Sequence, residues 1–200
     1  MPAPIDFYFD FLSPYGYLGS VGIEQVAGKH GRAVEWRPML LGINALKVMG
    51  IKPLNETPLK APYLKRDVPR TASYMGIPIV MHGTMMAPLP AARAFAWLAD
   101  DDAALAKRFG QAIYRAHWAE GRNMSTPAAV AAEAATVGID ADALLAAIET
   151  DRVKNRLKER VQDSIEVGVF GTPTFVVDGE MFWGSDRLPM VDRWLETGGF

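Results

Sequence analysis

Ser13 is the first candidate for a functional side chain, because it lies at the predicted junction of a strand and a helix. Residues 5–18 read IDFYFDFLSPYGYL, an alternating apolar segment that leads into a helix start at Ser13 and Pro14. A serine hydroxyl in that place accepts a free backbone N–H, and the following proline gives up a donor that has no partner. A helix start also offers N–H groups and partial positive charge to an anion. Ser13 is therefore either a helix cap alone or a ligand contact as well.

The stretch GVFGTPTF at residues 168–175 is the second place where the chain could bind a ligand. It sets Thr172 and Pro173 directly before a predicted strand. Proline there can simply mark the start of the strand, since the first residue of a strand tolerates it. If the bond between Thr172 and Pro173 were cis, the N–H and C=O of Thr172 would form an unpaired edge that could pair with an extended peptide. Both interpretations stay open on local sequence.

The absence of cysteine limits the possible chemistry. Among 200 residues there is none, which excludes disulfides, thiolate metal sites and a redox cycle on the protein's own sulfur. A thiol reaction would need a thiol that a ligand supplies. His30, His82 and His117 stand in contexts that favour surface or structural roles, so we assign no base to Ser13 and predict no metal site.

Charge and hydropathy exclude further classes of partner. The net charge is -2, and lysine and arginine are scattered, so we expect no nucleic-acid partner. No apolar run approaches membrane-spanning length, and the first residues lack the basic and apolar regions of a signal peptide. We therefore expect a cytoplasmic protein with no membrane partner.

The elements around Ser13 and Thr172 are predicted to form a small α/β sheet interrupted by helices. A strand from residue 5, a helix to about 29 and a strand over 34–37 make a βαβ unit. Breakers over 40–62 predict a long loop with room for a short helical turn. Helices are expected over 63–76, 88–99, 101–120, 127–137, 141–148 and 151–167. Strands over 174–177 and 180–183 follow, joined by a hairpin turn, and a helix over 185–195 ends the fold.

This order predicts a single domain over residues 1–200, with a helical insertion at about 60–150, because no Ser/Gly-rich or charged linker flanks the insertion. In the first strand the two-residue period puts Ile5, Phe7 and Phe9 on one face. Asp6, Tyr8 and Asp10 take the other face.

Three motifs together resemble a known family. DFLSPYGYL near the N-terminus, GVFGTPTF late in the chain and FWGSDR after the Asp178-Gly179 turn are similar to 2-hydroxychromene-2-carboxylate isomerases and the related kappa-class glutathione transferases. The resemblance spans nearly the whole chain. It implies a thioredoxin-like α/β fold with a DsbA-like helical insertion, as in the kappa class. In redox relatives a Cys-x-x-Cys motif takes the place of residues 13–16, which agrees with the absence of cysteine here.

The resemblance implies glutathione as the cofactor and Ser13 as the catalytic residue, whose hydroxyl would donate to the sulfur. The cysteinyl backbone of glutathione would pair with Thr172 beside a cis Pro173. Asp186 would hold the ammonium group of the γ-glutamyl end, and Ser185 its carboxylate. On local sequence Ser185 is also simply a helix cap, and Asp186 an acid in the first helical turn. The implied cofactor-binding set is Ser13, Thr172, Pro173, Trp183, Gly184, Ser185 and Asp186.

The second substrate is less well defined by the sequence. Lys60 and Tyr63, in KAPYLKRD, resemble a family stretch that reaches the glycine end of glutathione or the substrate. Ile51 stands where several relatives have an asparagine, so a polar contact is missing or is supplied elsewhere. An apolar aromatic pocket could be lined by Met81, Met85, Met86 and Trp36, although such residues also pack in cores and loops.

The function implied is a glutathione-dependent cis-trans isomerase of an aromatic-degradation intermediate, as in naphthalene catabolism. It would convert 2-hydroxychromene-2-carboxylate to trans-o-hydroxybenzylidenepyruvate by reversible thiol addition. The partner would be a small aromatic molecule, and the resemblance also implies a homodimer. The alternatives are a kappa-like glutathione transferase acting on another electrophile, and a non-catalytic thioredoxin-fold module that binds a peptide along the Thr172 edge.

Overall fold

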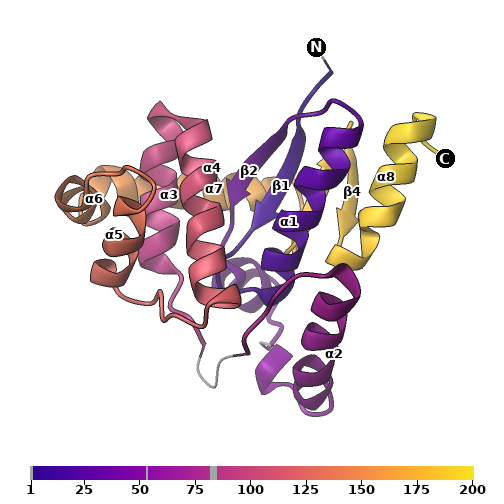
Figure 1. Ribbon diagram of the computed structural model, residues 1–200, viewed down its shortest axis with the longest axis horizontal. Coiled ribbons are helices and arrows are strands. Elements are labelled where there is room, and N and C mark those ends of the chain that lie inside the picture. Colours follow the sequence, from indigo (N-terminus) through magenta and orange to yellow (C-terminus); the bar gives the residue numbers. More distant parts are fainter. Residues whose placement is uncertain (1, 53, 82–84) are drawn as a thin grey trace.

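A mixed sheet of four strands forms the centre of the fold. The computed structural model describes residues 2–52, 54–81 and 85–200. The strands are β1 (Ile5–Phe9), β2 (Val34–Pro38), β3 (Thr174–Val177) and β4 (Glu180–Trp183), arranged in the order β2, β1, β3, β4. β1 runs parallel to β2 and antiparallel to β3, and Tyr8 lies opposite both Arg37 and Thr174. The two ends of the chain therefore meet in one sheet, with β1 and β3 in its middle (Figure 1).

The helix α1 (Pro14–Lys29) joins β1 to β2 and completes the predicted βαβ unit. Ser13 precedes the helix with an extended backbone, at φ -92° and ψ 120°, and its Oγ accepts the Gly16 N–H at 3.0 Å. At the other end, the N–H of His30 donates to carbonyls of the last helical turn. The predicted helix start at Ser13 is confirmed, and it lies just beyond the end of β1.

The remaining helices lie mostly between β2 and β3 in the chain. They are α2 (Lys60–Met75), α3 (Leu89–Asp101), α4 (Ala103–Tyr114), α5 (Pro127–Ala135), α6 (Ala141–Ile148) and α7 (Asp151–Glu166). Figure 1 shows α3, α4, α5 and α6 gathered on the β2 side of the sheet, while α2 stands apart near the lower end of α1. The last helix, α8 (Leu188–Thr197), lies beside α1. No helix within the described residues is both long and apolar enough to cross a membrane.

The predicted loop over residues 40–62 contains more regular structure than expected. It holds a π-helical segment, Gly42–Val48, and a 3-10 turn, Leu54–Glu56. The helix predicted from residue 63 begins already at Lys60. Pro62 therefore lies in the first turn of α2, where the missing N–H would have had no helical partner.

Two other helix starts also differ from the prediction. The helix expected from residue 101 starts at Ala103, because Asp102 is extended and its Oδ1 accepts the Leu105 N–H at 2.8 Å. Its predicted end at residue 120 is reached through a π-helical segment, Arg115–Ala119. The last helix starts at Leu188 rather than at residue 185, since a 3-10 turn, Ser185–Arg187, comes first.

Aromatic side chains fill the core between the sheet and the helices on its β2 side. Phe9 is fully buried, and its ring centroid lies 5.0 Å from that of Phe95 on α3 and 6.0 Å from that of Tyr114 on α4. Ile5, Phe7 and Phe9 are 0% exposed, which confirms the predicted apolar face of β1.

Much of the second face of β1 is buried as well, although the alternation placed Asp6, Tyr8 and Asp10 there. Tyr8 and Asp10 are 4% and 2% exposed. Met39 and Val169 pack with Tyr8 on this side of the sheet. Because β1 is a central strand, side chains from distant parts of the chain cover both of its faces.

Two glycines allow α1 to touch the segment that precedes β3. A Cβ atom on Gly16 would lie 2.6 Å from the Tyr114 hydroxyl and 3.2 Å from Thr172 Oγ1. A Cβ atom on Gly19 would lie 2.7 Å from two ring carbons of Pro173. Both positions therefore need glycine for close packing, and not for an unusual backbone angle.

We predict that Gly19→Ala lowers the free energy of unfolding by about 1–3 kcal/mol, because the added methyl group overlaps the Pro173 ring. The measurement is urea unfolding followed by circular dichroism. Gly28→Ala is the matched control: Gly28 lies on the same helix, a Cβ there would meet nothing within 4 Å, and alanine should stabilise the helix by about 0.5–1 kcal/mol. Equal effects of the two substitutions would contradict the close contact between α1 and Pro173.

Candidate functional site

The Ser13 hydroxyl lies at the meeting point of the two ends of the chain. Its Oγ accepts the Gly16 N–H at 3.0 Å and donates to the Thr172 carbonyl at 3.4 Å, across 159 positions of sequence. Ser13 is 5% exposed. The cap interpretation is thus confirmed, and the hydroxyl hydrogen makes only a long contact with the Thr172 carbonyl. The hydroxyl can therefore turn toward a better acceptor, such as a sulfur anion, with little loss.

Thr172 and Pro173 form the second part of the site. The peptide bond between them is cis, as the resemblance implied. Thr172 Oγ1 donates to the Tyr8 carbonyl at 3.3 Å, and the Gly184 N–H donates to the Pro173 carbonyl at 2.9 Å. The pairing of β3 with β1 and with β4 ends at Thr174, so Thr172 lies beyond the paired part of the sheet. Its pairing with an added strand, which would use such backbone groups, stays a prediction.

The third part is the segment after β4, Trp183 to Asp186. Gly184 has a φ of 114°, which favours glycine, and its N–H ties the segment to Pro173. Ser185 is buried, whereas the side chain of Asp186 is 69% exposed and lies 3.7 Å from Arg187 Nη2. The structure thus brings Ser13, Thr172, Pro173 and Gly184 together, and the exposed Asp186 beside them pairs with Arg187.

Ser185 is not the cap of the last helix, which corrects one of the two interpretations given above. It is the first residue of the 3-10 turn, and α8 begins only at Leu188. No side-chain cap bond is made at Gly184 before the turn or at Arg187 before α8.

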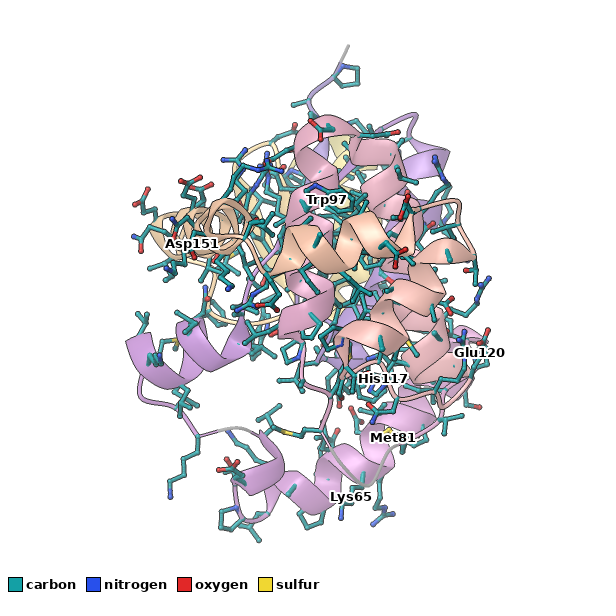
Figure 2. All side chains as sticks on the ribbon, turned by 90° about the vertical axis from the view of Figure 1, so that its left-hand side faces the viewer. Lys65, Met81, Trp97, His117, Glu120 and Asp151 are labelled. Carbon is teal, nitrogen blue, oxygen red and sulfur yellow. The ribbon has the colours of Figure 1, made fainter. Side chains whose placement is uncertain are left out.

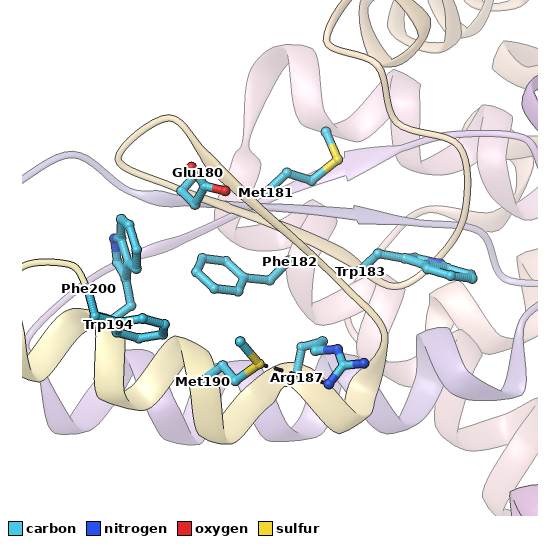
Figure 3. A pocket seen from close by; sticks show the side chains of 8 residues that line it. All are labelled: Glu180, Met181, Phe182, Trp183, Arg187, Met190, Trp194 and Phe200. Carbon is cyan, nitrogen blue, oxygen red and sulfur yellow. Dashed lines mark hydrogen bonds between the residues drawn. The ribbon is translucent and has the colours of Figure 1, made fainter.

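Trp183 stands at the edge of this segment. Its side chain is 53% exposed, and its ring centroid lies 4.9 Å from that of Phe170. Trp183 also lines one end of a groove of about 500 Å³ between β4 and α8. Figure 3 shows its ring pointing away from Trp194 and Phe200 at the other end of the groove. Neither Ser13 nor Thr172 lines that groove, so the groove is not the candidate site.

Lys60 and Tyr63 lie on the first two turns of α2, and both are exposed. The Tyr63 hydroxyl donates to Asp67 Oδ1 at 2.9 Å and accepts from Arg70 Nη2 at 3.2 Å. No contact of Lys60 or Tyr63 with Ser13 is present among the described residues. Their assignment to the site stays a prediction.

Asp67 connects α2 to the start of α1, and sequence reasoning missed it. Tyr15, two residues after Ser13, donates its hydroxyl to Asp67 Oδ2, while Tyr63 and Arg70 donate to Oδ1. Partial burial alone would raise the pKa of Asp67, but these hydrogen bonds outweigh it and lower the pKa. The available signal was the four-residue spacing of Tyr63 and Asp67, which puts both on one helix face.

Asp10 supports the site from behind, and it too was missed. Its carboxylate accepts the N–H groups of Leu12 at 3.0 Å and Leu41 at 2.8 Å, and its backbone carbonyl accepts the Tyr114 hydroxyl at 2.9 Å. Burial raises the pKa of Asp10 to about 6, although the two backbone hydrogen bonds oppose the shift. Asp10 therefore fixes the turn between β1 and Ser13 and ties it to the segment after β2.

The described histidines have structural roles. His30 Nε2 lies 2.7 Å from Asp192 Oδ1, at the end of α1 opposite to Ser13. His117 is buried, and its Nδ1 is hydrogen-bonded to the Arg122 carbonyl at 2.9 Å. These findings fit the predicted surface or structural roles, while His82 lies outside the described residues.

Among the described residues, the three methionines and Trp36 do not share one environment. Trp36 and Met86 are buried in the core, whereas Met81 and Met85 are 37% and 52% exposed. Figure 2 shows Met81 toward the lower end of the molecule, on the same side as Lys65 of α2. Ile51, where relatives have an asparagine, is 48% exposed, and its N–H donates to the Ala45 carbonyl at 3.0 Å.

Comparisons with known proteins show which proteins this chain resembles. Residues 4–196 match the family model of the DSBA-like thioredoxin domain. A 2-hydroxychromene-2-carboxylate isomerase of Pseudomonas sp. (strain C18) is 30% identical over 191 residues, covering 94% of this chain and 88% of that protein. Glutathione S-transferase kappa 1 of Homo sapiens is 26% identical over 213 residues, covering 98% and 94%. A solved 2-hydroxychromene-2-carboxylate isomerase structure matches with a TM-score of 0.82 at 29% identity, covering 96% and 94% of the two chains.

We predict that Asp10 destabilises the fold as the pH rises. Its pKa is about 6 in the folded protein and near 3.8 when unperturbed. The contribution of Asp10 to the free energy of unfolding is therefore complete below pH 3.8 and is lost as the pH rises through about 6. At roughly 1.36 kcal/mol per pKa unit, the loss is about 3 kcal/mol. The measurement is the free energy of unfolding, by urea, of the wild type relative to Asp10→Asn between about pH 4 and about pH 7.

Asp178→Asn provides the control with the opposite sign. Hydrogen bonds from Arg32 lower the pKa of Asp178, so its contribution is present above its ordinary pKa and is lost as the pH falls. The stability of the wild type relative to Asp178→Asn should stay nearly constant between about pH 4 and about pH 7 and should fall as the pH drops below about 3.8. A flat difference between wild type and Asp10→Asn would show that Asp10 does not titrate in this range.

Proposed function

This chain belongs to the DSBA-like thioredoxin domain family, among the 2-hydroxychromene-2-carboxylate isomerases, and we propose that it is a glutathione-dependent cis-trans isomerase. The proposed substrate is 2-hydroxychromene-2-carboxylate and the product trans-o-hydroxybenzylidenepyruvate, as in naphthalene degradation. The observation that carries the proposal is the Ser13 hydroxyl, held at the start of α1 and 3.4 Å from the Thr172 carbonyl.

The residues of the site fit the parts of glutathione. Thr172, beyond the paired part of β3, offers backbone groups to the cysteinyl unit of an extended peptide. The Asp186 side chain is 69% exposed, so its carboxylate can accept hydrogen bonds from the γ-glutamyl ammonium group. Its contact with Arg187 Nη2, at 3.7 Å, is long enough to leave the carboxylate accessible. Ser185 and the backbone of the 3-10 turn lie beside it and suit the γ-glutamyl carboxylate.

The proposed role of Ser13 is to lower the pKa of the glutathione thiol. A free thiol with a pKa of about 8.5 is mostly protonated at neutral pH and is a poor nucleophile. A hydroxyl that donates a hydrogen bond to sulfur stabilises the charged form, and so does the positive end of a 16-residue helix. Ser13 therefore binds the glutathione sulfur and stabilises its negative charge, and it does not attack the substrate.

Glutathione, when bound, would supply a thiolate for reversible addition to a conjugated double bond. The protein's part is to position the reactants. The hydrogen bond from Tyr15 to Asp67 fixes α2 next to the start of α1, so Lys60 and Tyr63 are carried by a helix anchored at the site. Lys60, as an exposed cation, suits the glycine carboxylate of glutathione or a carboxylate of the substrate.

A kappa-like glutathione transferase is the second candidate, and the 26% identity to the human kappa-class protein favours it. Both candidates use the same thiolate and differ in whether glutathione stays on the product. Either reaction suits the cytosol, where glutathione is the main thiol pool, and we infer a cytoplasmic protein that forms a homodimer, as the family resemblance implies.

We predict that Ser13→Ala loses most of the isomerisation rate, by roughly 10- to 100-fold, because one charge-assisted hydrogen bond of about 1.5–3 kcal/mol is removed. The measurement is the absorbance change of 2-hydroxychromene-2-carboxylate with saturating glutathione. Loss of the helix cap would also lower stability by about 1 kcal/mol. Ser13→Gly separates the two effects, since glycine retains most of the capping preference and still lacks the hydroxyl.

Ser20→Ala is the matched control for this experiment. Ser20 is buried on the same helix, and its hydroxyl donates to the Tyr17 carbonyl at 2.7 Å. Its activity should stay near that of the wild type. Full activity of Ser13→Gly in a folded protein would remove Ser13 from the mechanism.

We predict that glutathione is required in the isomerase assay and that its total concentration stays constant. The measurement combines the absorbance assay with thiol quantification before and after complete conversion. Consumption of one glutathione for each substrate would indicate a transferase.

Calorimetric titration tests the peptide-binding alternative, in which the protein would not bind glutathione and would bind an extended peptide at the Thr172 edge.

A further inference from the structure

Two side chains of the helical insertion reach the turn that precedes Ser13. This turn begins at Asp10 and is closed by a hydrogen bond from the Ser13 N–H to the Asp10 carbonyl at 2.9 Å. The Tyr114 hydroxyl donates to the same carbonyl at 2.9 Å, and the Trp118 indole N–H donates to the Phe11 carbonyl at 3.0 Å. These two bonds join residues 104 and 107 positions apart. The insertion is therefore bonded directly to the backbone that carries Ser13.

The Tyr114 hydroxyl also lies against the first turn of α1. A Cβ atom on Gly16 would lie 2.6 Å from the hydroxyl oxygen, so the absence of a side chain at Gly16 makes room for it. Gly16 is the residue whose N–H donates to Ser13 Oγ. Tyr114 thus contacts the backbone on both sides of Ser13, at Asp10 and at Gly16, and it is only 1% exposed.

The two donors fix the direction of two carbonyl groups next to the candidate site. A backbone carbonyl oxygen has two lone pairs, and that of Asp10 accepts from both the Ser13 N–H and the Tyr114 hydroxyl. Trp118 holds the Phe11 carbonyl. A carbonyl oxygen that turned toward Ser13 would compete for its hydroxyl hydrogen and would repel an anion bound there. With both carbonyls held, the Ser13 hydroxyl stays available to a ligand.

The helix that carries the two donors is irregular between them. Tyr114 is the last residue of α4, and Trp118 belongs to the π-helical segment Arg115–Ala119, which packs against α1. The Glu120 N–H donates to the Arg115 carbonyl, five residues earlier, at 3.0 Å. Turns of this kind are rare and frequently occur at functional sites. The irregular turn thus coincides with the side chains that reach the Ser13 turn.

We propose that Tyr114 and Trp118 are positioning residues, whose hydrogen bonds to Asp10 and Phe11 hold the Ser13 hydroxyl where it can donate to a thiolate. Both side chains are buried, so they act through the turn and not by touching glutathione or substrate. This role rests on the proposed function for the identity of the ligand, whereas the hold on the turn is a property of the free protein.

Amide hydrogen exchange of the free protein tests the hold on the turn. Tyr114→Phe and Trp118→Phe each remove one donor and keep an aromatic ring. In each variant the Ser13 N–H should lose about 10-fold more protection than the fall in global stability accounts for. Trp36→Phe is the matched control, because Trp36 is 5% exposed, against 6% for Trp118, and its indole N–H donates to Glu24 Oε1 at 2.8 Å, away from the turn. It should change Ser13 protection only as far as global stability changes.

The thiol pKa of bound glutathione tests the consequence for the ligand. The measurement is the ultraviolet absorbance of the thiolate, titrated against pH at saturating glutathione. Tyr114→Phe and Trp118→Phe should each raise this pKa toward the value found in Ser13→Ala, whereas Trp36→Phe should leave it unchanged. In the Ser13→Ala background, Tyr114→Phe should raise it no further, because a residue that acts through Ser13 has no effect once the hydroxyl is absent.

The two measurements separate this inference from the proposed function. A wild type that does not bind glutathione, or does not lower its thiol pKa, would refute the proposed function, and hydrogen exchange would still decide whether Tyr114 and Trp118 hold Ser13. Ser13 protection that follows global stability alone in both variants would overturn the inference. A thiol pKa lowered in the wild type and equally low in both variants would overturn it as well, as would a full effect of Tyr114→Phe in the Ser13→Ala background.

Discussion

The contact between α1 and the segment before β3 is the constraint on which the candidate site depends. Gly16 and Gly19 have no side chains, so Thr172 and Pro173 can lie directly against the helix. The Tyr8 carbonyl and the Gly184 N–H then fix the same two residues from the sheet. The Ser13 hydroxyl is placed by this packing as much as by its own cap bond. The first turn of α1 thus packs against residues separated from it by more than 150 positions in the sequence.

Local patterns in the sequence were sufficient where the structure is set by local chemistry. The strands over residues 174–177 and 180–183 have the predicted bounds, because the turn between them, Asp178 and Gly179, takes the positive φ values that such a turn requires. The cap at Ser13 was predictable for the same reason. The choice between the two conformations of the Thr172 to Pro173 bond was not local, and it came from the family resemblance.

Contacts between distant segments explain what the sequence could not show. Alternation along β1 put Asp10 on the face opposite Phe9 but gave no sign that this face is covered, whereas β1 is central and Met39 and Val169 pack on that face. Asp67 was missed because its key partner, Tyr15, lies on another helix. The contact of Tyr114 with the turn before Ser13 likewise depends on how α4 packs and leaves no mark on the sequence nearby.

The serine hydroxyl at the start of α1 also makes this position resistant to oxidation. Peroxide converts a reactive thiolate to sulfenic and then sulfinic acid, but a serine hydroxyl does not undergo this chemistry. With no cysteine in the chain, methionine is the sulfur that oxidants reach. Met49, Met85 and Met190 are 44%, 52% and 39% exposed. Their sulfoxides are reversible by dedicated reductases, so oxidative damage would fall on repairable surface positions and leave the hydrogen bonds of Ser13 chemically intact.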